Sequence, residues 1–227
     1  ATAARRFANE EDAFVYSRFS NPNVTMLERR LAALEGTEAC IGTGSGMGAI
    51  LLLFMALLKS GDHVICSRSV FGSTMALFGK EFAKFGVETT FVSQTDVAQW
   101  SAALRPNTKL ISVTTPHNPT GVSLTEPTLR RLIALAEARG IRLLVDETYR
   151  EMSFIPKLPV AASLSPSAIS VSSVSKSYGI PGVRVGWIIS RDPKLMERFL
   201  AAKEQIGICG SVIDEQIAEA ALQQSAP

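Results

Sequence analysis

One lysine in the sequence lies among residue types that together suggest chemistry. The segment SVSSVSKSYGIPGVRVGW places Ser173 and Ser175 shortly before Lys176, and Arg184 eight residues after it. An amine confined in an apolar pocket is a nucleophile toward aldehydes, because burial disfavours its charged form. Two hydroxyls and a guanidinium can bind a phosphate dianion, the guanidinium through two parallel hydrogen bonds. The segment therefore indicates a reactive lysine beside an anion site, although a solvated surface lysine is the commoner case.

A glycine-rich turn, TGSGMGAI at residues 43–50, has the form of a strand that runs into a helix. Free backbone N–H groups at a helix N-terminus attract anions, and glycines allow a phosphate to come close. We predict a phosphate cradle formed by Ser45, Gly46 and Met47. Close packing of strand and helix is the alternative explanation, and the turn is neither a P-loop nor a clean G-x-G-x-x-G.

Two further polar segments, TTPHNPTG at 114–121 and VDETYRE at 145–151, follow apolar runs. The amide of Asn118 can donate a hydrogen bond to a ligand oxygen, or the segment can be a simple turn. Asp146 ends a buried strand, where a carboxylate is costly unless a cation or a protonated nitrogen faces it. A helix N-cap or a salt bridge would also satisfy it. Tyr149 lies just beyond, within reach of the same ligand.

Pyridoxal 5′-phosphate (PLP) has a chemical group for each of these features. Its phosphate, ring nitrogen, phenolic oxygen and aldehyde call for an anion site, an acid, polar donors and an amine. We therefore predict that the aldehyde reacts with Lys176, that the ring nitrogen binds Asp146, and that the phenolic oxygen accepts from Asn118 and Tyr149. The residues predicted to bind the phosphate are Ser45, Gly46, Met47, Ser173 and Arg184, with Ser175 nearby. No metal ligand is expected.

The elements that position these residues alternate between short β-rich runs and helical patterns. Seven strands are predicted, at 38–43, 63–67, 88–93, 109–114, 141–147, 168–174 and 185–190. The nearly continuous apolar character of 109–114 and 141–147 is typical of strands covered on both faces. The pattern predicts a three-layer α/β/α fold with a mostly parallel sheet, in which ligand groups gather beyond the carboxyl ends of the strands.

The composition is that of a globular protein with a small-molecule partner. Of the 227 residues, 46% are hydrophobic and 19% are charged, and 23 basic against 21 acidic residues leave a net charge of +2. This balance argues against a nucleic-acid surface or a membrane patch. The 3 widely spaced cysteines fit buried thiols in a reducing compartment rather than a zinc site. The longest apolar run, 48–58, is shorter than a membrane span, and without a signal core a cytoplasmic location is expected.

From about Thr114 onward the chain resembles the class I/II aminotransferases of fold type I. The segments HNPTG, VDETY and SVSKSYGIPGVRVGW carry this resemblance. It implies that Lys176 forms the Schiff base with the cofactor (the internal aldimine) and shuttles a proton. It also implies that Asp146 is the partner of the ring nitrogen, that Asn118 and Tyr149 contact the phenolic oxygen, and that Ser173 and Arg184 are phosphate ligands.

The front of the chain resembles a different group, the Cys/Met-metabolism PLP enzymes and in particular the O-succinylhomoserine sulfhydrylases. The segments YSRFSNPNVTMLERRLAALEG, SGMGAI and SGDHVICSRSVFGST carry this resemblance. It implies that Tyr16 and Arg18 reach the phosphate of a neighbouring subunit in a homodimer, and that Phe71 stacks on the pyridine ring. Because the resemblance changes near residues 113–116, a chimera of two fold-type-I enzymes is one hypothesis and a divergent natural enzyme is the other.

Both families imply a smaller C-terminal domain whose arginine binds the substrate carboxylate, and this sequence shows no counterpart of either. We expect residues 1–36 to form an N-terminal arm and first helix, and residues 37–227 to form the PLP-binding large domain. The expected function is that of an aminotransferase acting on an amino acid and a 2-oxo acid, with Lys176, Asp146 and Tyr149 as catalytic residues. The alternatives are γ-elimination or γ-replacement, or a truncated or engineered PLP-binding module with little turnover.

Overall fold

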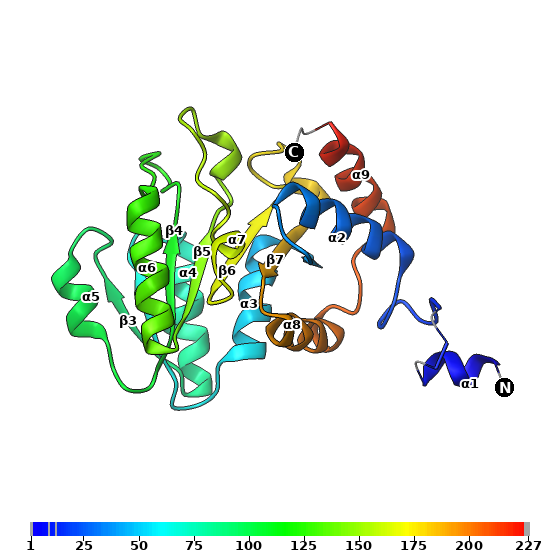
Figure 1. The fold of residues 1–227 in the computed structure, drawn as a ribbon, viewed down its shortest axis with the longest axis horizontal. Coiled ribbons are helices and arrows are strands. Elements are labelled where there is room, and N and C mark those ends of the chain that lie inside the picture. Colours follow the sequence, from blue (N-terminus) through cyan, green and yellow to red (C-terminus); the bar gives the residue numbers. More distant parts are fainter. Residues whose placement is uncertain (1, 9, 12, 225–227) are drawn as a thin grey trace.

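A seven-stranded sheet between two layers of helices forms the body of the protein in a computed structural model, which describes residues 2–8, 10–11 and 13–224 (Figure 1). The strands are β1 (Ile41–Thr43), β2 (His63–Ser67), β3 (Glu88–Val92), β4 (Thr108–Thr114), β5 (Arg142–Asp146), β6 (Ala168–Ser173) and β7 (Gly186–Ser190). Their order is β1-β7-β6-β5-β4-β2-β3. Strand β7 runs antiparallel to both of its neighbours, while the pairs among β2 to β6 are parallel. The predicted fold class and all seven predicted strands are confirmed.

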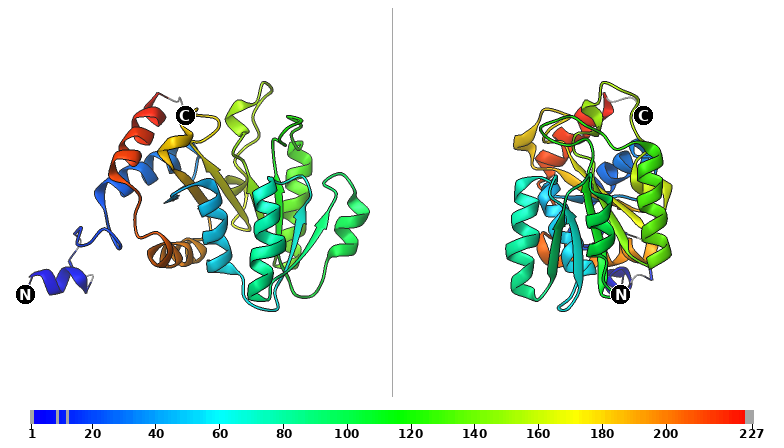
Figure 2. Two further views of the ribbon diagram at one scale, coloured as in Figure 1. Left: turned by 180° about the vertical axis from the view of Figure 1, so that it is seen from behind. Right: turned by 90° about the vertical axis from the view of Figure 1, so that its left-hand side faces the viewer.

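The helices cover both faces of the sheet and continue beyond its β1 edge (Figure 2). Their bounds are α1 (Thr2–Phe7), α2 (Pro22–Leu34), α3 (Gly46–Leu57), α4 (Gly72–Ala76), α5 (Val97–Ala103), α6 (Glu126–Arg139), α7 (Ala161–Leu164), α8 (Pro193–Ile206) and α9 (Val212–Gln223). Helix α6 shows how the sequence sets such bounds. The side chain of Thr125 accepts a hydrogen bond from the N–H of Thr128, and Gly140 ends the helix with a left-handed φ of 62°. Helix α1 stands apart from the body, at the end of the N-terminal segment.

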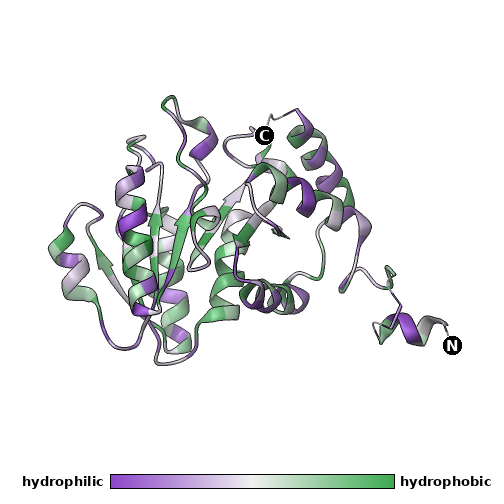
Figure 3. Cartoon of the chain, in the orientation of Figure 1, coloured by the Kyte–Doolittle hydropathy of each residue, from purple (hydrophilic) through white to green (hydrophobic). Residues whose placement is uncertain are grey.

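Successive residues of the central strands point into different halves of the core. Leu110 and Leu144 pack with α3 and α8, whereas Ile111 and Leu143 pack with α5 and α6. Each such burial contributes about 1.5–3 kcal/mol. In Figure 3 the strands are largely hydrophobic, and hydrophilic residues recur along the helices. Burial on both faces holds β4, β5 and β6 in place within the sheet. The polar segments begin where these strands end.

Several whole-chain features bear on the sequence predictions. Cys40 and Cys66 are buried and Cys209 is half-buried, and all three are free thiols. Within the described ranges, no helix is long and apolar enough to cross a membrane. The same ranges contain no group of His, Cys, Asp and Glu side chains that could hold a metal ion.

Two acidic side chains near the end of β5 are largely shielded from solvent: Glu147 is buried, and Glu35 is partly buried. Glu147 accepts a hydrogen bond from the N–H of Ala161 at 3.1 Å. Glu35 accepts one from the indole of Trp187 at 3.1 Å and lies 3.5 Å from the guanidinium of Arg150. Burial raises the pKa of Glu147 to about 8, and the nearby charge of Glu35 contributes to the rise. Glu147 is therefore protonated in the folded protein at pH values where it is ionised in the unfolded chain.

We expect the Glu147→Gln variant to lose part of the pH dependence of stability. The pKa of Glu147 rises on folding from 4.5 to about 8, so its contribution to stability is fully present below pH 4.5 and is lost as the pH rises through 8. Glutamine has no proton to release. Urea unfolding should therefore show that, between pH 5 and pH 8, the free energy of unfolding of the variant rises relative to that of the wild type by on the order of 2–4 kcal/mol.

The matched control is Glu126→Gln, which removes an exposed carboxylate paired with Arg130 on α6. This change should move stability by less than about 0.5 kcal/mol at either pH. Identical pH profiles for the wild type and the Glu147→Gln variant would show that Glu147 does not keep its proton in the fold.

Candidate active site

One cavity lies at the carboxyl ends of β5 and β6, beside the start of α3. Its volume is about 240 Å³, and its lining comprises Ser45, Gly46, Met47, Ile50, Phe71, Asp146, Thr148, Tyr149, Ser173, Ser175, Lys176, Pro181 and Arg184. All the predicted site residues except Asn118, Tyr16 and Arg18 are in this set. The two halves of the sequence therefore meet in one site, as expected for the carboxyl edge of a doubly wound sheet.

The turn between β1 and α3 forms one end of this cavity. The hydroxyl of Ser45 caps α3 by accepting a hydrogen bond from the N–H of Gly48 at 2.9 Å. The N–H groups of Gly46 and Met47, in the first turn, have no acceptor within a helix. A Cβ on Gly46 would lie 3.6 Å from the Cβ of Ser173 and would fill the space between them. The turn thus offers backbone donors and room for an anion such as phosphate.

Ser173 and Arg184 lie at the same end of the cavity. Ser173 is buried at the end of β6, and its hydroxyl accepts a hydrogen bond from the N–H of Ser175 at 3.4 Å. Arg184 adopts a left-handed backbone with φ 53° and ψ 45°, which costs a non-glycine residue about 1–3 kcal/mol. Its guanidinium donates to the carbonyl of Pro181 at 2.7 Å, which leaves other N–H groups for a ligand. A strained arginine beside backbone donors fits a phosphate group.

Asp146 ends β5 and lines the same cavity. Its Oδ1 accepts two hydrogen bonds from Thr148, from the N–H at 3.1 Å and from the hydroxyl at 2.7 Å. Its Oδ2 accepts none from the residues that the structure describes. Burial raises the pKa of this carboxyl, and the Thr148 hydrogen bonds oppose the rise. A protonated ring nitrogen at Oδ2 would stabilise the ionised form, so Asp146 fits this part of PLP.

Lys176 lines the cavity, but its side chain is exposed, contrary to the expected confinement in an apolar pocket. The cause is its position in a turn beyond β6, where the N–H of Gly179 donates to the Lys176 carbonyl at 3.0 Å. Neighbouring strands do not cover a turn beyond the edge of the sheet. No carboxylate among the described side chains pairs with its amine, which therefore remains free to react with an aldehyde.

Tyr149 and Asn118 act together rather than as two independent donors. Asn118 Nδ2 donates to the Tyr149 hydroxyl at 2.9 Å. Tyr149 lines the cavity itself, whereas Asn118 lines a neighbouring hollow of about 340 Å³ between the loops that follow β4 and β5. Asn118 reaches the cavity through Tyr149 in this arrangement.

The three aromatic and basic residues predicted from the front of the chain differ in position. Phe71 lines the cavity, half of its surface remaining exposed. Tyr16 packs against the edge of Phe19, and the guanidinium of Arg18 donates to the carbonyl of Glu204 on α8. Stacking by Phe71 and contact of Tyr16 and Arg18 with a neighbouring subunit stay predictions.

Sequence reasoning missed Thr148, which fixes the orientation of the Asp146 carboxylate through two hydrogen bonds. A signal was present, because an Asp followed two residues later by a hydrogen-bonding residue is typical of an Asx-turn.

Comparisons with known proteins place residues 1–220 in one family. The sequence model of the Cys/Met metabolism PLP-dependent enzymes matches residues 1–220, without a break at 113–116. The chain is 42% identical over 186 residues to an O-succinylhomoserine sulfhydrylase from Pseudomonas aeruginosa. That match covers 82% of this chain and 45% of the relative. It is 34% identical over 213 residues to an L-methionine gamma-lyase from Porphyromonas gingivalis. That match covers 92% of this chain and 51% of the relative. The chain thus spans about half the length of these relatives.

Solved structures agree on the fold. The crystal structure of metB from Corynebacterium glutamicum matches with a TM-score of 0.81 and 31% identity, over 94% of this chain and 54% of that one. A PLP-dependent aminotransferase from Streptococcus suis matches with a TM-score of 0.80 over 98% of this chain and 59% of that one, but at only 23% identity. The second likeness shows the fold alone.

The prediction of an aminotransferase is wrong in the light of these matches. The family and the similar sequences are those of sulfhydrylases and gamma-lyases, which eliminate or replace a substituent. The motifs behind the prediction surround the cofactor, and both kinds of enzyme need those residues. The γ-elimination or γ-replacement alternative agrees better with the matches.

Proposed function

Because the chain belongs to the Cys/Met metabolism family of PLP-dependent enzymes, we propose that it catalyses elimination or replacement at the γ-carbon of an amino acid. The names of its relatives suggest substrates with a thioether or an O-acyl ester at that carbon. The match to this family and to these relatives carries the choice of reaction. The cavity that joins a phosphate cradle, the free Oδ2 of Asp146 and the amine of Lys176 supports the binding of PLP.

In this proposal the chain's residues hold PLP at four places: the phosphate, the ring nitrogen, the phenolic oxygen and the face of the ring. The N–H groups of Gly46 and Met47, with the hydroxyls of Ser45, Ser173 and Ser175 and the guanidinium of Arg184, bind the phosphate. Asp146 binds the ring nitrogen, Tyr149 the phenolic oxygen with support from Asn118, and Phe71 covers the ring. When bound, PLP delocalises the electron pair left at Cα after a proton is removed.

Lys176 is the residue we assign to proton transfer. Elimination at Cγ requires that protons leave Cα and Cβ, and the leaving group departs with the electron pair of its bond to Cγ. Lys176 lines the cavity and its side chain is exposed, so a substrate can approach it. It can accept these protons and return them to carbon as the product forms.

We further propose that residues 37–227 form the cofactor-binding unit and that the protein works as a homodimer. Neither Tyr16 nor Arg18 lines the cavity of its own chain, and the segment that bears them leads outward to α1 (Figure 1). This placement supports a role for Tyr16 and Arg18 at the cavity of a second copy. The ends of the proposed units at residues 1 and 225–227 lie outside the described residues.

The test is a product analysis with the PLP-loaded chain. From L-methionine and water, elimination yields methanethiol, ammonia and 2-oxobutanoate in equal amounts. From O-succinyl-L-homoserine and sulfide, replacement yields homocysteine and succinate. We expect at least one of these product sets. Cofactor binding without either set would support the binding-module alternative, and faster exchange of the amino group with an added 2-oxo acid would overturn the proposal.

A further inference from the structure

Ser177 joins the turn that bears Lys176 to the loop that bears Thr148. Its hydroxyl donates a hydrogen bond to the backbone carbonyl of Thr148 at 2.9 Å, although the two residues are 29 positions apart in the chain. Because β5 and β6 are parallel, the loops that follow them leave the same edge of the sheet. The half-buried Ser177 therefore connects two loops beyond the point where their strands have ended.

Thr148 carries this connection on to the acid of the cofactor cavity. Its N–H and its hydroxyl both donate to Asp146 Oδ1, at 3.1 Å and 2.7 Å, while its carbonyl accepts from Ser177. On the other side, Lys176 precedes Ser177 directly, and the N–H of Gly179 donates to the Lys176 carbonyl at 3.0 Å within the turn. A continuous series of hydrogen bonds and covalent bonds thus runs from the acid to the residue that bears the amine.

The proposed cofactor requires a particular spacing between this acid and this amine. The aromatic ring of PLP is rigid, so its ring nitrogen and its aldehyde carbon are a fixed distance apart. Asp146 has to meet the nitrogen while Lys176 reaches the aldehyde. Lys176 is exposed on a flexible four-carbon stem, so its side chain alone does not set this spacing. The position of its turn relative to Asp146 has to supply it.

We propose that Ser177 is a positioning residue for the reaction of Lys176 with the cofactor, an inference that rests on the PLP binding in the proposed function. In that reaction the amine nitrogen forms a C=N bond with the aldehyde carbon, and the aldehyde oxygen leaves as water with the two amine hydrogens. By holding its turn against Thr148, Ser177 keeps the amine at the distance from Asp146 that the rigid ring requires.

The Ser177→Ala variant tests this inference with aldehydes that differ in the ring nitrogen. 4-Pyridinecarboxaldehyde carries its nitrogen opposite the aldehyde, as PLP does, whereas benzaldehyde has no nitrogen. Borohydride reduction followed by peptide mass spectrometry measures the extent of reaction at Lys176. We expect reaction with PLP and with 4-pyridinecarboxaldehyde to fall about tenfold, the equivalent of one hydrogen bond, and reaction with benzaldehyde to stay within about twofold. A hydrogen bond that only stabilises the fold would not distinguish these aldehydes.

A double-mutant cycle with Asp146→Asn provides a second test. Asparagine keeps the acceptor for Thr148 but lacks the charge that binds the ring nitrogen. If Ser177 acts through the spacing to Asp146, the Ser177→Ala change should alter reaction with PLP by no more than about twofold in this background. Equal losses in both backgrounds, or an equal fall with both ring aldehydes, would overturn the inference.

Two further variants separate positioning from folding. Ser177→Thr keeps the hydroxyl and should restore reaction with PLP to within about threefold of the wild type. Ser163→Ala removes another half-buried hydroxyl, which donates to the carbonyl of Val160 at 2.7 Å away from the cavity, and should leave the reaction unchanged. A wild-type protein without a reducible PLP adduct would overturn the proposed function and the inference with it. Equal adduct in the wild type and the Ser177→Ala protein would overturn the positioning role alone.

Discussion

The Lys176→Ala variant is expected to lose turnover by roughly 10²–10⁴-fold or more, the range for removal of one general acid–base group. It should also lose covalent attachment of the cofactor, because no other lysine among the described residues lines the cavity. Two measurements check this. The visible absorption of the protein loaded with PLP should disappear, and borohydride reduction followed by peptide mass spectrometry should find the cofactor on Lys176 in the wild type only.

Two controls separate the amine chemistry from charge and from folding. Lys176→Arg keeps a positive charge but not the nucleophilic amine, so we expect the same loss as with alanine. Lys194→Ala removes an exposed lysine at the start of α8 and should leave activity and absorption unchanged. Because Lys176 is itself exposed, its replacement should change stability by less than about 0.5 kcal/mol. A reducible adduct that persists in the Lys176→Ala protein would move the assignment to another residue.

The strands could be predicted because burial on both faces leaves a strong signal. The runs at 109–114 and 141–147 are apolar throughout, and they became β4 and β5 in the middle of the sheet. The ends were less predictable. The run at 38–43 contributes only Ile41–Thr43, since pairing with β7 begins at Ile41. Val185 was expected to open β7, but the left-handed backbone of Arg184 delays its start to Gly186. Such limits depend on tertiary contacts rather than on local pattern.

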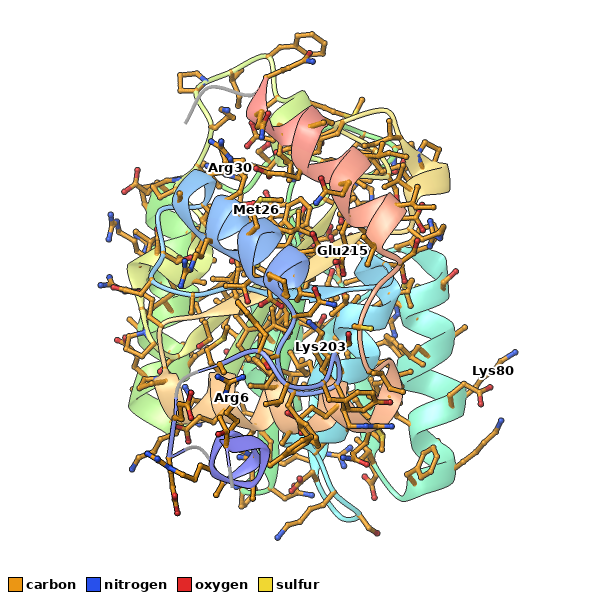
Figure 4. All side chains as sticks on the ribbon, turned by 90° about the vertical axis from the view of Figure 1, so that its right-hand side faces the viewer. Arg6, Met26, Arg30, Lys80, Lys203 and Glu215 are labelled. Carbon is orange, nitrogen blue, oxygen red and sulfur yellow. The ribbon has the colours of Figure 1, made fainter. Side chains whose placement is uncertain are left out.

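The candidate site could be predicted in outline because strand ends converge at one edge of the sheet. What could not be read from the sequence were relations between side chains. The separation of Asn118 from the cavity depends on the two loops that pack around it, and the exposure of Lys176 depends on the turn beyond β6. Glu215 Oε2 is buried without a hydrogen-bond partner among the described residues, and the amine of Lys203 donates to Glu28 instead (Figure 4). Each relation joins segments far apart in the chain.

The reaction class was mispredicted for a related reason. Lys176, Asp146 and Tyr149 serve the cofactor, and one cofactor supports many reactions. Residues that contact the substrate decide between amino transfer and elimination. The front segments from Tyr16 to Thr74 did indicate the right family, and the match over residues 1–220 agrees with them.

The Asp146→Asn variant should separate stability from catalysis. Burial raises the pKa of the Asp146 carboxyl, so its ionised form is unfavourable in the cofactor-free protein. Asparagine keeps the acceptor for Thr148 without the charge, so cofactor-free protein should become slightly more stable to heat. With PLP bound, however, the ring nitrogen would lose its anionic partner. Breaking such a pair costs about 3–5 kcal/mol, so turnover should fall by roughly 10²–10³-fold or more.

Thermal unfolding without cofactor and kcat with cofactor, measured on the same preparations, test the two halves of this prediction. Thr148→Val is the matched control, since it removes one of the two hydrogen bonds to Oδ1 and leaves the carboxylate. It should lower turnover far less than Asp146→Asn, and it should raise the pKa of Asp146 further because the lost bond stabilised the anion. If Asp146→Asn keeps turnover within about threefold, Asp146 does not face the ring nitrogen, because loss of a buried counter-charge cannot be that mild.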